Sequence, residues 1–223
     1  KIFCYYEEII NFPKKYKNKI LLINPLLRKE FYSFQPSNKN EINNEIKLLI
    51  IGGSQGAQLF DNELKKAIIS ISKKYKLNIY QQTSPSNVKN LGNFYNEHNI
   101  PYKLFSFEEN IFKLTSHVNL CVTRAGASTL SELTFLNIPY LAIPYPLAKD
   151  DHQFQNALFY KNKDCCWLLK EKELKNEVLT NYLINIIKNK DDYLTKKKNM
   201  VKFSYQNTWN KINQKLINTF YEN

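Results

Sequence analysis

The pattern of apolar and polar positions changes near Lys47, where short apolar runs begin to alternate with longer amphipathic segments. In the first amphipathic segment Leu64, Ala67, Ile68 and Ile71 are separated by three or four residues, the periodicity of a helix with one buried face. The apolar runs are continuous rather than alternating, which is typical of strands buried on both sides. Six runs are expected to be strands: 47–53, 77–82, 102–107, 118–123, 139–144 and 164–169.

Repeated strand–helix–strand units form parallel sheets that helices cover on both faces. The predicted fold class is therefore α/β, a doubly wound parallel sheet, in a domain at residues 45–205. Residues 1–34 stand outside the alternation and resemble the tail of another domain, and polar residues 35–44 indicate a linker. Residues 206–223 predict a C-terminal helix with an apolar face, and the lysines at 196–198 predict a solvated helix face.

The composition limits the classes of protein to which the chain can belong. The chain has 223 residues, enough for a sizeable core but too few for two full nucleotide-binding domains. No apolar run approaches the roughly 18 residues that a membrane span needs. The four cysteines form no C-x-x-C pair, which favours a reducing cytoplasm. Because residue 1 is Lys and no signal pattern follows it, we interpret the chain as a fragment whose upstream part is truncated or separately encoded.

The charge distribution argues against a nucleic-acid ligand. The formal net charge is +12, but residues 31–160 carry 12 basic and 10 acidic residues, so the excess lies at the two ends. A nucleic-acid binder usually concentrates basic residues on its recognition element. We therefore expect no nucleic-acid partner.

Four of the five glycines occupy two strand-to-helix junctions. Gly52, Gly53 and Gly56 lie in GGSQGA after the first strand, and Gly126 lies in RAGAST after the fourth. Glycine lets backbone N–H groups approach a phosphate, and a helix N-terminus adds unsatisfied donors and partial positive charge. If the strand order is 3-2-1-4-5-6, both junctions flank the switch point where such sheets bind ligands, which suits a diphosphate. The alternative is that both are simply tight turns.

Two common nucleotide motifs are not met. The glycine spacing is G-G-x-x-G, no acidic residue ends the 77–82 strand, and no Gly-Lys-Ser/Thr follows the glycines. These departures disfavour NAD binding and P-loop chemistry. No cofactor and no metal site are expected, since no second His or Cys lies at ligand spacing from His152.

Polar residues after the fourth and fifth strands are candidates for the same cleft. Glu132 either closes a capping box with Ser128 or Thr129, or accepts hydrogen bonds from two ribose hydroxyls. Asp150 or Asp151 could N-cap the following helix. His152 and Gln153 would then face the cleft, where an amide suits sugar hydroxyls.

Together these residues resemble a known family. GGSQGA, R-x-G-A-x-T-x-S-E and D-H-Q-x-x-N-A occur in the same order as in the C-terminal donor-binding domain of bacterial glycosyltransferase family 28. This resemblance implies transfer of N-acetylglucosamine from UDP-GlcNAc to undecaprenyl-diphospho-muramoyl-pentapeptide, which converts lipid I to lipid II in peptidoglycan synthesis. The resemblance implies one Rossmann-like half of a GT-B fold.

The resemblance also implies an inverting hexosyltransferase that is inactive without its N-terminal half. That half would supply the general base and bind the undecaprenyl-linked acceptor, and no segment here matches it. The catalytic residue is therefore unknown. The implied location is cytoplasmic and peripheral, at the membrane surface on the inner face of the plasma membrane.

The family's donor contacts are carried over by position. Ser54 and Gln55 would lie against the diphosphate or sugar, Phe107 beside the uracil, and Glu132 on the ribose. The remaining implied contacts are Ala127, Ser128 and Thr129 at a helix N-terminus, and His152 and Gln153 on the GlcNAc hydroxyls. Arg28 is the weakest assignment, because Ile23 and Leu27 replace the Gly and Arg of the family's Gly-Asn-Pro-Val-Arg and leave Arg28 one residue late.

Other interpretations remain open. The chain also resembles the catalytic subunit of the eukaryotic two-subunit dolichol-linked GlcNAc transferase, although the NPLLR segment and the DDHQ order favour the bacterial family. A different class is a non-catalytic nucleotide-sugar-binding module. A basic nucleic-acid-binding protein is the least favoured, since no recognition motif is present.

Overall fold

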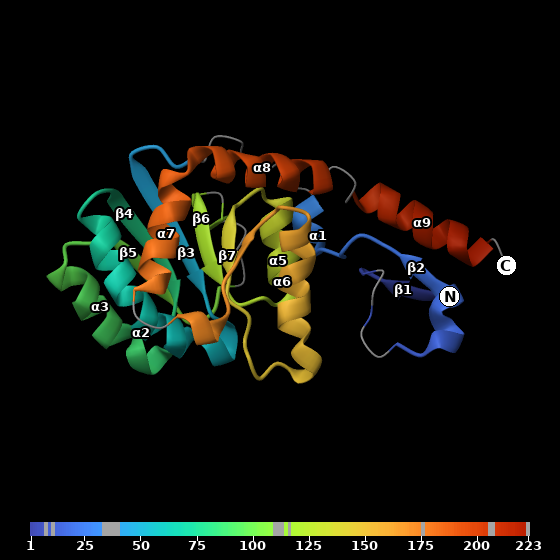
Figure 1. Ribbon diagram of the computed structural model, residues 1–223, viewed down its shortest axis with the longest axis horizontal. Coiled ribbons are helices and arrows are strands. Elements are labelled where there is room, and N and C mark those ends of the chain that lie inside the picture. The colour runs from blue at the N-terminus through green and yellow to red at the C-terminus, as the bar shows by residue number, and fades with distance from the viewer. Residues whose placement is uncertain are drawn as a thin grey trace.

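A computed structural model describes residues 1–6, 9, 12–32, 41–108, 114–115, 117–174, 177–204 and 208–221, without the side chains of 54–57. Its main element is a six-stranded, wholly parallel sheet in the order β5-β4-β3-β6-β7-β8 (Figure 1). This order confirms the predicted doubly wound sheet and the 3-2-1-4-5-6 arrangement. The strands are β3 (Glu45–Ile51), β4 (Lys76–Gln82), β5 (Tyr102–Phe105), β6 (Leu120–Thr123), β7 (Tyr140–Ala142) and β8 (Trp167–Leu168).

Helices connect and cover the strands. They are α1 (Lys29–Tyr32), α2 (Gly53–Ser72), α3 (Val88–Glu97), α5 (Ala127–Phe135), α6 (His152–Asn162), α7 (Val178–Lys188), α8 (Lys190–Ser204) and α9 (Trp209–Tyr221). Short 3-10 turns are η1 (Lys14–Lys19), η2 (Pro85–Asn87), η3 (Lys149–Asp151) and η4 (Glu171–Glu173). The last strand is shorter than the predicted 164–169, because Asp164 is left-handed and Cys165 N–H still bonds the Tyr160 carbonyl at the end of α6.

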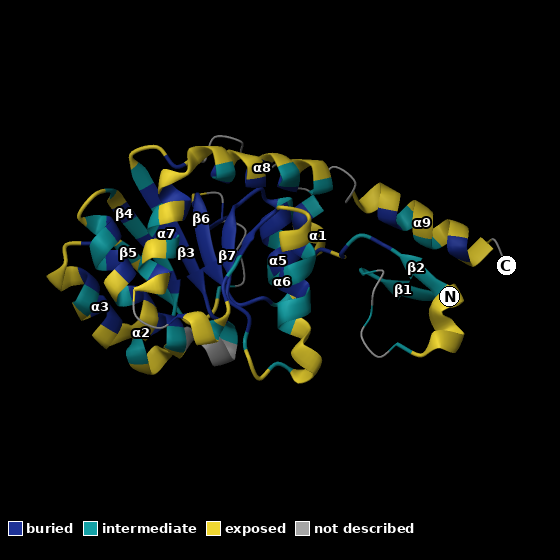
Figure 2. Cartoon of the chain, viewed as in Figure 1, coloured by how far each residue is buried: buried dark blue, intermediate teal, exposed yellow. Residues whose placement is uncertain are grey.

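Two cores lie on opposite faces of the sheet. Along β3, Leu48 and Ile50 point into a core with α2 and α7, whereas Leu49 and Ile51 point into a second core with α5 and α6. The strands are buried from both sides and the helices expose their outer faces (Figure 2). The helices α2 and α5 follow neighbouring strands but cover opposite faces. Their N-termini therefore lie at the same carboxyl-terminal end of the sheet, one on each side of it.

A smaller part accompanies this α/β body. Strands β1 (Ile2–Cys4) and β2 (Ile20–Leu22) pair in parallel as a separate sheet, and α9 lies beside it (Figure 1). Ile212 of α9 is buried, but Phe220 is 72% exposed. The division at residues 1–34, 35–44, 45–205 and 206–223 stays a prediction, and most of the linker, 33–40, is outside the described residues.

The lysines at 196–198 correct the sequence interpretation. Only Lys198 is exposed, while Lys196 and Lys197 are buried on the inner face of α8. Lys196 Nζ lies 2.6 Å from Asp164 Oδ1 and 2.7 Å from Asp192 Oδ1. Burial alone would lower its pKa, but these two carboxylates raise the pKa above its usual value. Two of the three lysines therefore face the body, because their long stems pack while the ammonium finds partners.

The cysteines behave as small core residues. Cys121, Cys165 and Cys166 are buried, Cys4 is half-buried, and all four are free thiols. Burial raises the pKa of Cys165 to about 11 and that of Cys166 to about 12. The buried thiols are therefore protonated and inert at neutral pH.

Candidate nucleotide-binding site

The site begins where β3 and β6 end. Ile51 pairs with Thr123 in the sheet, and the Arg124 N–H donates to the Ile51 carbonyl at 3.1 Å. The two following helices, α2 and α5, therefore start side by side on opposite faces. Both junctions therefore lie at the same carboxyl-terminal end of the sheet, on either side of the point where the strand order reverses.

The glycines sit differently from the expected loops. Gly52 is the N-cap of α2, but Gly53 and Gly56 belong to the helix itself, and Gly126 is the N-cap of α5. Gly53 has a φ of +64°, so the chain turns from strand to helix within one residue. A Cβ there would meet nothing within 4 Å, which makes the backbone conformation the reason for glycine. The backbone N–H groups offered at this junction therefore belong to the first turn of a helix rather than to a loop.

Gln82, the last residue of β4, connects two of the expected contacts. Gly53 N–H donates to Gln82 Oε1 at 2.9 Å, and Gln82 Nε2 donates to the Ser106 carbonyl at 3.2 Å. Phe107 follows directly and is 76% exposed. From the sequence, this strand end was considered only for an acidic residue, so the amide was missed. The available signal was that the strand ending at Gln82 was expected to neighbour the strand that leads into GGSQGA.

Glu132 points from α5 toward Arg28. Arg28 Nε lies 2.9 Å from Glu132 Oε1, and Nη2 lies 3.3 Å from Oε2. The carboxylate side chain is 13% exposed and the guanidinium side chain 49%. Burial raises the pKa of Glu132 above its usual value, while the hydrogen bond and charge of Arg28 act in the opposite direction. Glu132 is therefore a largely buried carboxyl group whose charged form Arg28 favours.

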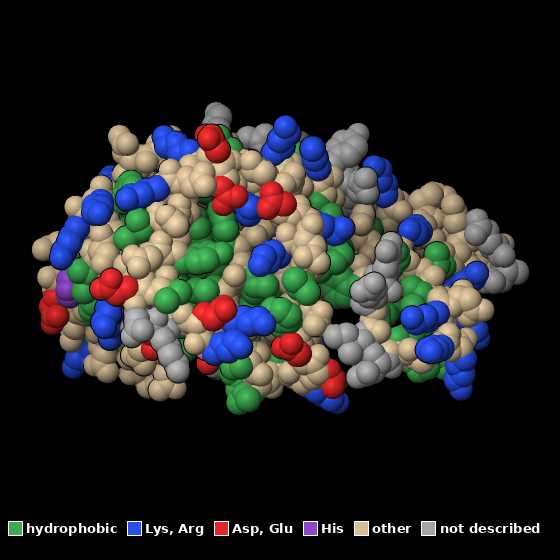
Figure 3. Space-filling model, in the orientation of Figure 1, with side chains coloured by type: hydrophobic (Ala, Val, Ile, Leu, Met, Phe, Trp, Pro, Cys, Tyr) green, Lys and Arg blue, Asp and Glu red, His purple; other side chains and the backbone are tan. Residues whose placement is uncertain are grey.

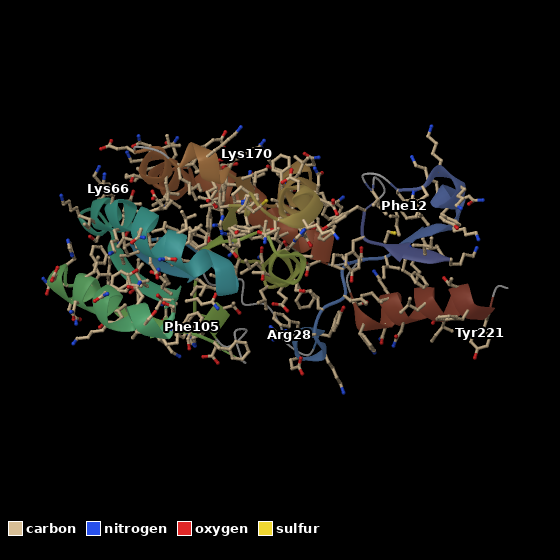
Figure 4. All side chains as sticks on the ribbon, turned by 90° about the horizontal axis from the view of Figure 1, so that it is seen from below. Phe12, Arg28, Lys66, Phe105, Lys170 and Tyr221 are labelled. Carbon is tan, nitrogen blue, oxygen red and sulfur yellow. The ribbon has the colours of Figure 1, made fainter. Side chains whose placement is uncertain are left out.

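The capping interpretation of Glu132 is wrong. Gly126 occupies the N-cap of α5, and the cap makes no side-chain hydrogen bond. The one-residue offset of the arginine also has a structural reason. Leu27 packs into the core, and Arg28 reaches the site from the segment before α1, where the N-terminal part meets the α/β body (Figure 4). The structure thus brings Arg28 to the other candidates.

The first turn of α5 supplies three more candidates. Ala127 and Ser128 are exposed and Thr129 is half-buried, so all three are accessible at the start of the helix. Ser131 is buried and donates to the Ser128 carbonyl at 2.8 Å. The side chains of Ser54 and Gln55 are outside the described residues. Their backbone lies in the first turn of α2.

Gln153 is already committed to the backbone. Its Oε1 accepts the N–H groups of Ala125 at 3.1 Å and Tyr145 at 3.0 Å, joining the turns after β6 and β7. His152 is exposed, and its Nδ1 lies 2.8 Å from the Lys149 carbonyl. Only the Gln153 NH₂ group is therefore left to meet a ligand.

The aspartates before α6 do not cap it as expected. Asp150 and Asp151 both have a φ of +53°, and the N-cap Asp151 makes no side-chain capping bond. The left-handed pair turns the chain into the helix, a conformation that short polar residues tolerate best after glycine. Their role is backbone geometry rather than a side-chain cap.

Two buried residues, which were not predicted as ligands from the sequence, hold these turns in place. Arg124 Nη1 donates to the carbonyls of Ile143 at 3.3 Å and Pro144 at 3.1 Å, and lies 2.6 Å from Glu171 Oε2. Asn156 Nδ2 donates to the Ala125 carbonyl at 3.0 Å, and its Oδ1 accepts from the Tyr6 hydroxyl. Both hold the segment that carries Gly126.

A pocket of about 1150 Å³ lies elsewhere, between the N-terminal strands, α6, α8 and α9. None of the candidate donor residues lines it, so cavity size does not locate the nucleotide site. Within the described ranges no cluster of His, Cys, Asp and Glu is placed to hold a metal. None of the helices in the described part is both long and apolar enough to cross a bilayer. Over the α/β body, basic and acidic side chains are intermixed on the face in Figure 3.

Comparisons with known proteins agree with this geometry. Residues 47–212 match the glycosyltransferase family 28 C-terminal domain. The chain is 53% identical, over its whole length, to a Pelagibacter ubique protein named UDP-N-acetylglucosamine–N-acetylmuramyl-(pentapeptide) pyrophosphoryl-undecaprenol N-acetylglucosamine transferase, and covers 62% of it. A Rickettsia bellii protein of the same name is 31% identical over 207 residues, with 91% of this chain and 58% of that protein covered.

Solved structures share the fold. Acinetobacter baumannii MurG has a TM-score of 0.62 at 24% identity, over 81% of this chain and 49% of that chain. The spinosyn rhamnosyltransferase SpnG, solved with thymidine diphosphate, has a TM-score of 0.54 at 18% identity, over 82% of this chain and 46% of that chain. The architecture is that of the C-terminal Rossmann-like half of a GT-B glycosyltransferase, and the chain spans about three fifths of its curated relatives.

Proposed function

The chain belongs to the glycosyltransferase family 28 C-terminal domain, and we propose that it is the UDP-GlcNAc-binding half of an inverting N-acetylglucosaminyltransferase. The acceptor would be undecaprenyl-diphospho-muramoyl-pentapeptide, the substrate class in the names of its relatives. The observation that carries the proposal is the pair of helix starts, of α2 and α5, that follow the neighbouring strands β3 and β6 at one end of the sheet.

These two helix starts suit a diphosphate. Each first turn presents N–H groups that lack intrahelical acceptors, and each helix dipole favours an anion by about 0.3–1 kcal/mol. In this proposal the turn of Gly52, Gly53 and Gly56, with Ser54 and Gln55, contacts one side of the diphosphate and sugar. Gly126, Ala127, Ser128 and Thr129 contact the other side.

The polar side chains would recognise the two sugars and the base. Glu132 accepts the ribose hydroxyls, with Arg28 keeping the carboxylate ionised and near the diphosphate. Because Gln153 Oε1 is occupied, its NH₂ group acts only as a donor to GlcNAc hydroxyls, with His152 beside it. Phe107, next to the end of β5, borders the uracil.

The other half of the reaction would lie in an N-terminal domain. Inverting transfer needs a base that takes the acceptor hydroxyl proton while the leaving UDP is stabilised. This chain supplies the second function, and the base would belong to the acceptor half. Residues 1–34 and the helix at 206–223 would join the two halves at the inner, cytoplasmic face of the membrane, where the enzyme is peripheral.

Calorimetric titration tests the donor assignment. The chain should bind UDP and UDP-GlcNAc more tightly than NAD, because Gln82, and not an acidic residue that could hold an adenosine ribose, ends β4; UDP-glucose is titrated alongside them. Tighter binding of NAD than of UDP would contradict the proposal. UDP-GlcNAc binding that yields no transfer even with an acceptor half supplied would favour a non-catalytic nucleotide-sugar module.

A further inference from the structure

Gln82 lies at the carboxyl-terminal end of β4, between the ends of two neighbouring strands. Strand β4 lies between β3, which leads into the glycine turn, and β5, which leads toward Phe107. Gln82 is the last residue of β4 and is paired in register with Phe105. Its side chain is half-buried and belongs to neither core.

The Gln82 amide uses both of its functions on backbone groups. The oxygen accepts the first N–H of α2, from Gly53, and the nitrogen donates to the Ser106 carbonyl. Gly53 has a left-handed φ of +64°, so this bond fixes the residue at which the chain turns into the helix. The amide groups that follow in the first turn are then aimed by that start.

The chemistry of this bridge is specific to a carboxamide of this length. An ionised carboxylate accepts but cannot donate, a thioether does neither well, and the amide of Asn is one methylene shorter. The two bonds also join segments that meet different parts of the same ligand. One segment is the diphosphate turn, and the other carries Phe107 on the base side.

We propose that Gln82 is a positioning residue that fixes the diphosphate-binding turn of α2 relative to the uracil-side segment at Ser106 and Phe107. The inference rests on the proposed function, since it concerns the same donor site. Gln82 does not need to touch the ligand. It sets the separation between two contacts that a nucleoside diphosphate must reach at once, and that neither uridine nor pyrophosphate alone must span.

Gln82→Met and Gln82→Asn test this role, with Gln214→Met on the exposed face of α9 as the control. UDP, uridine and pyrophosphate are titrated separately, by calorimetry for UDP and by NMR for the weak ligands. Loss of two backbone hydrogen bonds should weaken UDP binding about tenfold in Gln82→Met. Uridine and pyrophosphate should change less than about twofold, because each uses one side of the bridge.

The outcomes separate the inference from the proposed function. UDP binding reduced in both Gln82 variants, with uridine and pyrophosphate retained and Gln214→Met unchanged, supports positioning. Unchanged UDP affinity in the Gln82 variants overturns the positioning role. A parallel loss of affinity for UDP, uridine and pyrophosphate, together with a lower melting temperature, also overturns it, because that result indicates a structural role alone. Wild-type protein that does not prefer UDP over NAD overturns the proposed function itself. The Asn variant keeps a polar amide, so its result decides the question if the Met variant does not fold.

Discussion

Glu132→Ala is the change that best separates ligand binding from folding. The Glu132 carboxylate pairs with Arg28 and caps no helix end. Arg28 is half-exposed, so the ion pair contributes no more than about 0–1 kcal/mol to the free energy of unfolding. Removing the carboxylate should therefore leave the fold nearly as stable as before.

Binding should respond much more strongly. A hydrogen bond to a charged group contributes about 1.5–3 kcal/mol, and each 1.4 kcal/mol is a tenfold change in Kd. Glu132 is only 13% exposed, so water replaces it poorly when it is removed. We expect UDP to bind Glu132→Ala roughly ten- to a hundredfold more weakly than the wild type.

The assay pairs calorimetric titration of UDP with thermal unfolding, and Glu97→Ala, an exposed glutamate near the end of α3, is the control. Glu97→Ala should leave both quantities unchanged. The reasoning is refuted if Glu132→Ala lowers stability by about 1 kcal/mol, the usual cost of a lost cap, while UDP affinity stays the same.

Two further predictions concern pH and catalysis. Because burial raises the pKa of Glu132, the carboxylate should become protonated at a higher pH than usual, and UDP-GlcNAc affinity should fall as pH drops through that value. Arg28→Ala should move the midpoint of this pH dependence to higher pH, since Arg28 favours the ionised form of Glu132, and Glu132→Gln should abolish the pH dependence. The measurement is a series of calorimetric titrations from pH 8 to 5. A midpoint in Arg28→Ala equal to that of the wild type would contradict the prediction. Alone, the chain should not transfer GlcNAc to a lipid I analogue, because positioning and acid–base catalysis both need the acceptor half. A radiolabelled transfer assay that shows robust turnover by the purified chain, lost in His152→Ala, would place a base within these residues.

The sheet could be predicted because its signals are local. A strand buried on both faces must be apolar throughout, as LLII (48–51) and LCV (120–122) are, and glycine marks the turn where such a strand enters a helix. The strand order then places the junctions after β3 and β6 together without any knowledge of side chains. The candidate Glu132 followed from its sequence distance to the junction after β6, and Gln153 followed from its position after the next strand, β7.

The directions of long polar side chains could not be predicted. Periodicity assigns Lys196 to a helix but does not reveal that Asp164 and Asp192 lie within reach of its ammonium. It places Gln82 at a strand end but not between the Gly53 N–H and the Ser106 carbonyl. Such contacts join residues that are distant in sequence, and each depends on a rotamer that only the packed structure selects.

The same contacts change how substitutions at this site should be interpreted. Gln153 and Asn156 hold the turn after β6 through Ala125, so their removal can weaken ligand binding by displacing Gly126 and the start of α5. Among the described residues the Glu132 side chain bonds Arg28, and it takes no part in holding those turns. A loss of UDP affinity in Glu132→Ala therefore reports a lost contact, whereas the same loss in Gln153→Ala combines a lost NH₂ donor with a displaced backbone. Only a variant of the first kind would measure what the proposed ribose contact contributes.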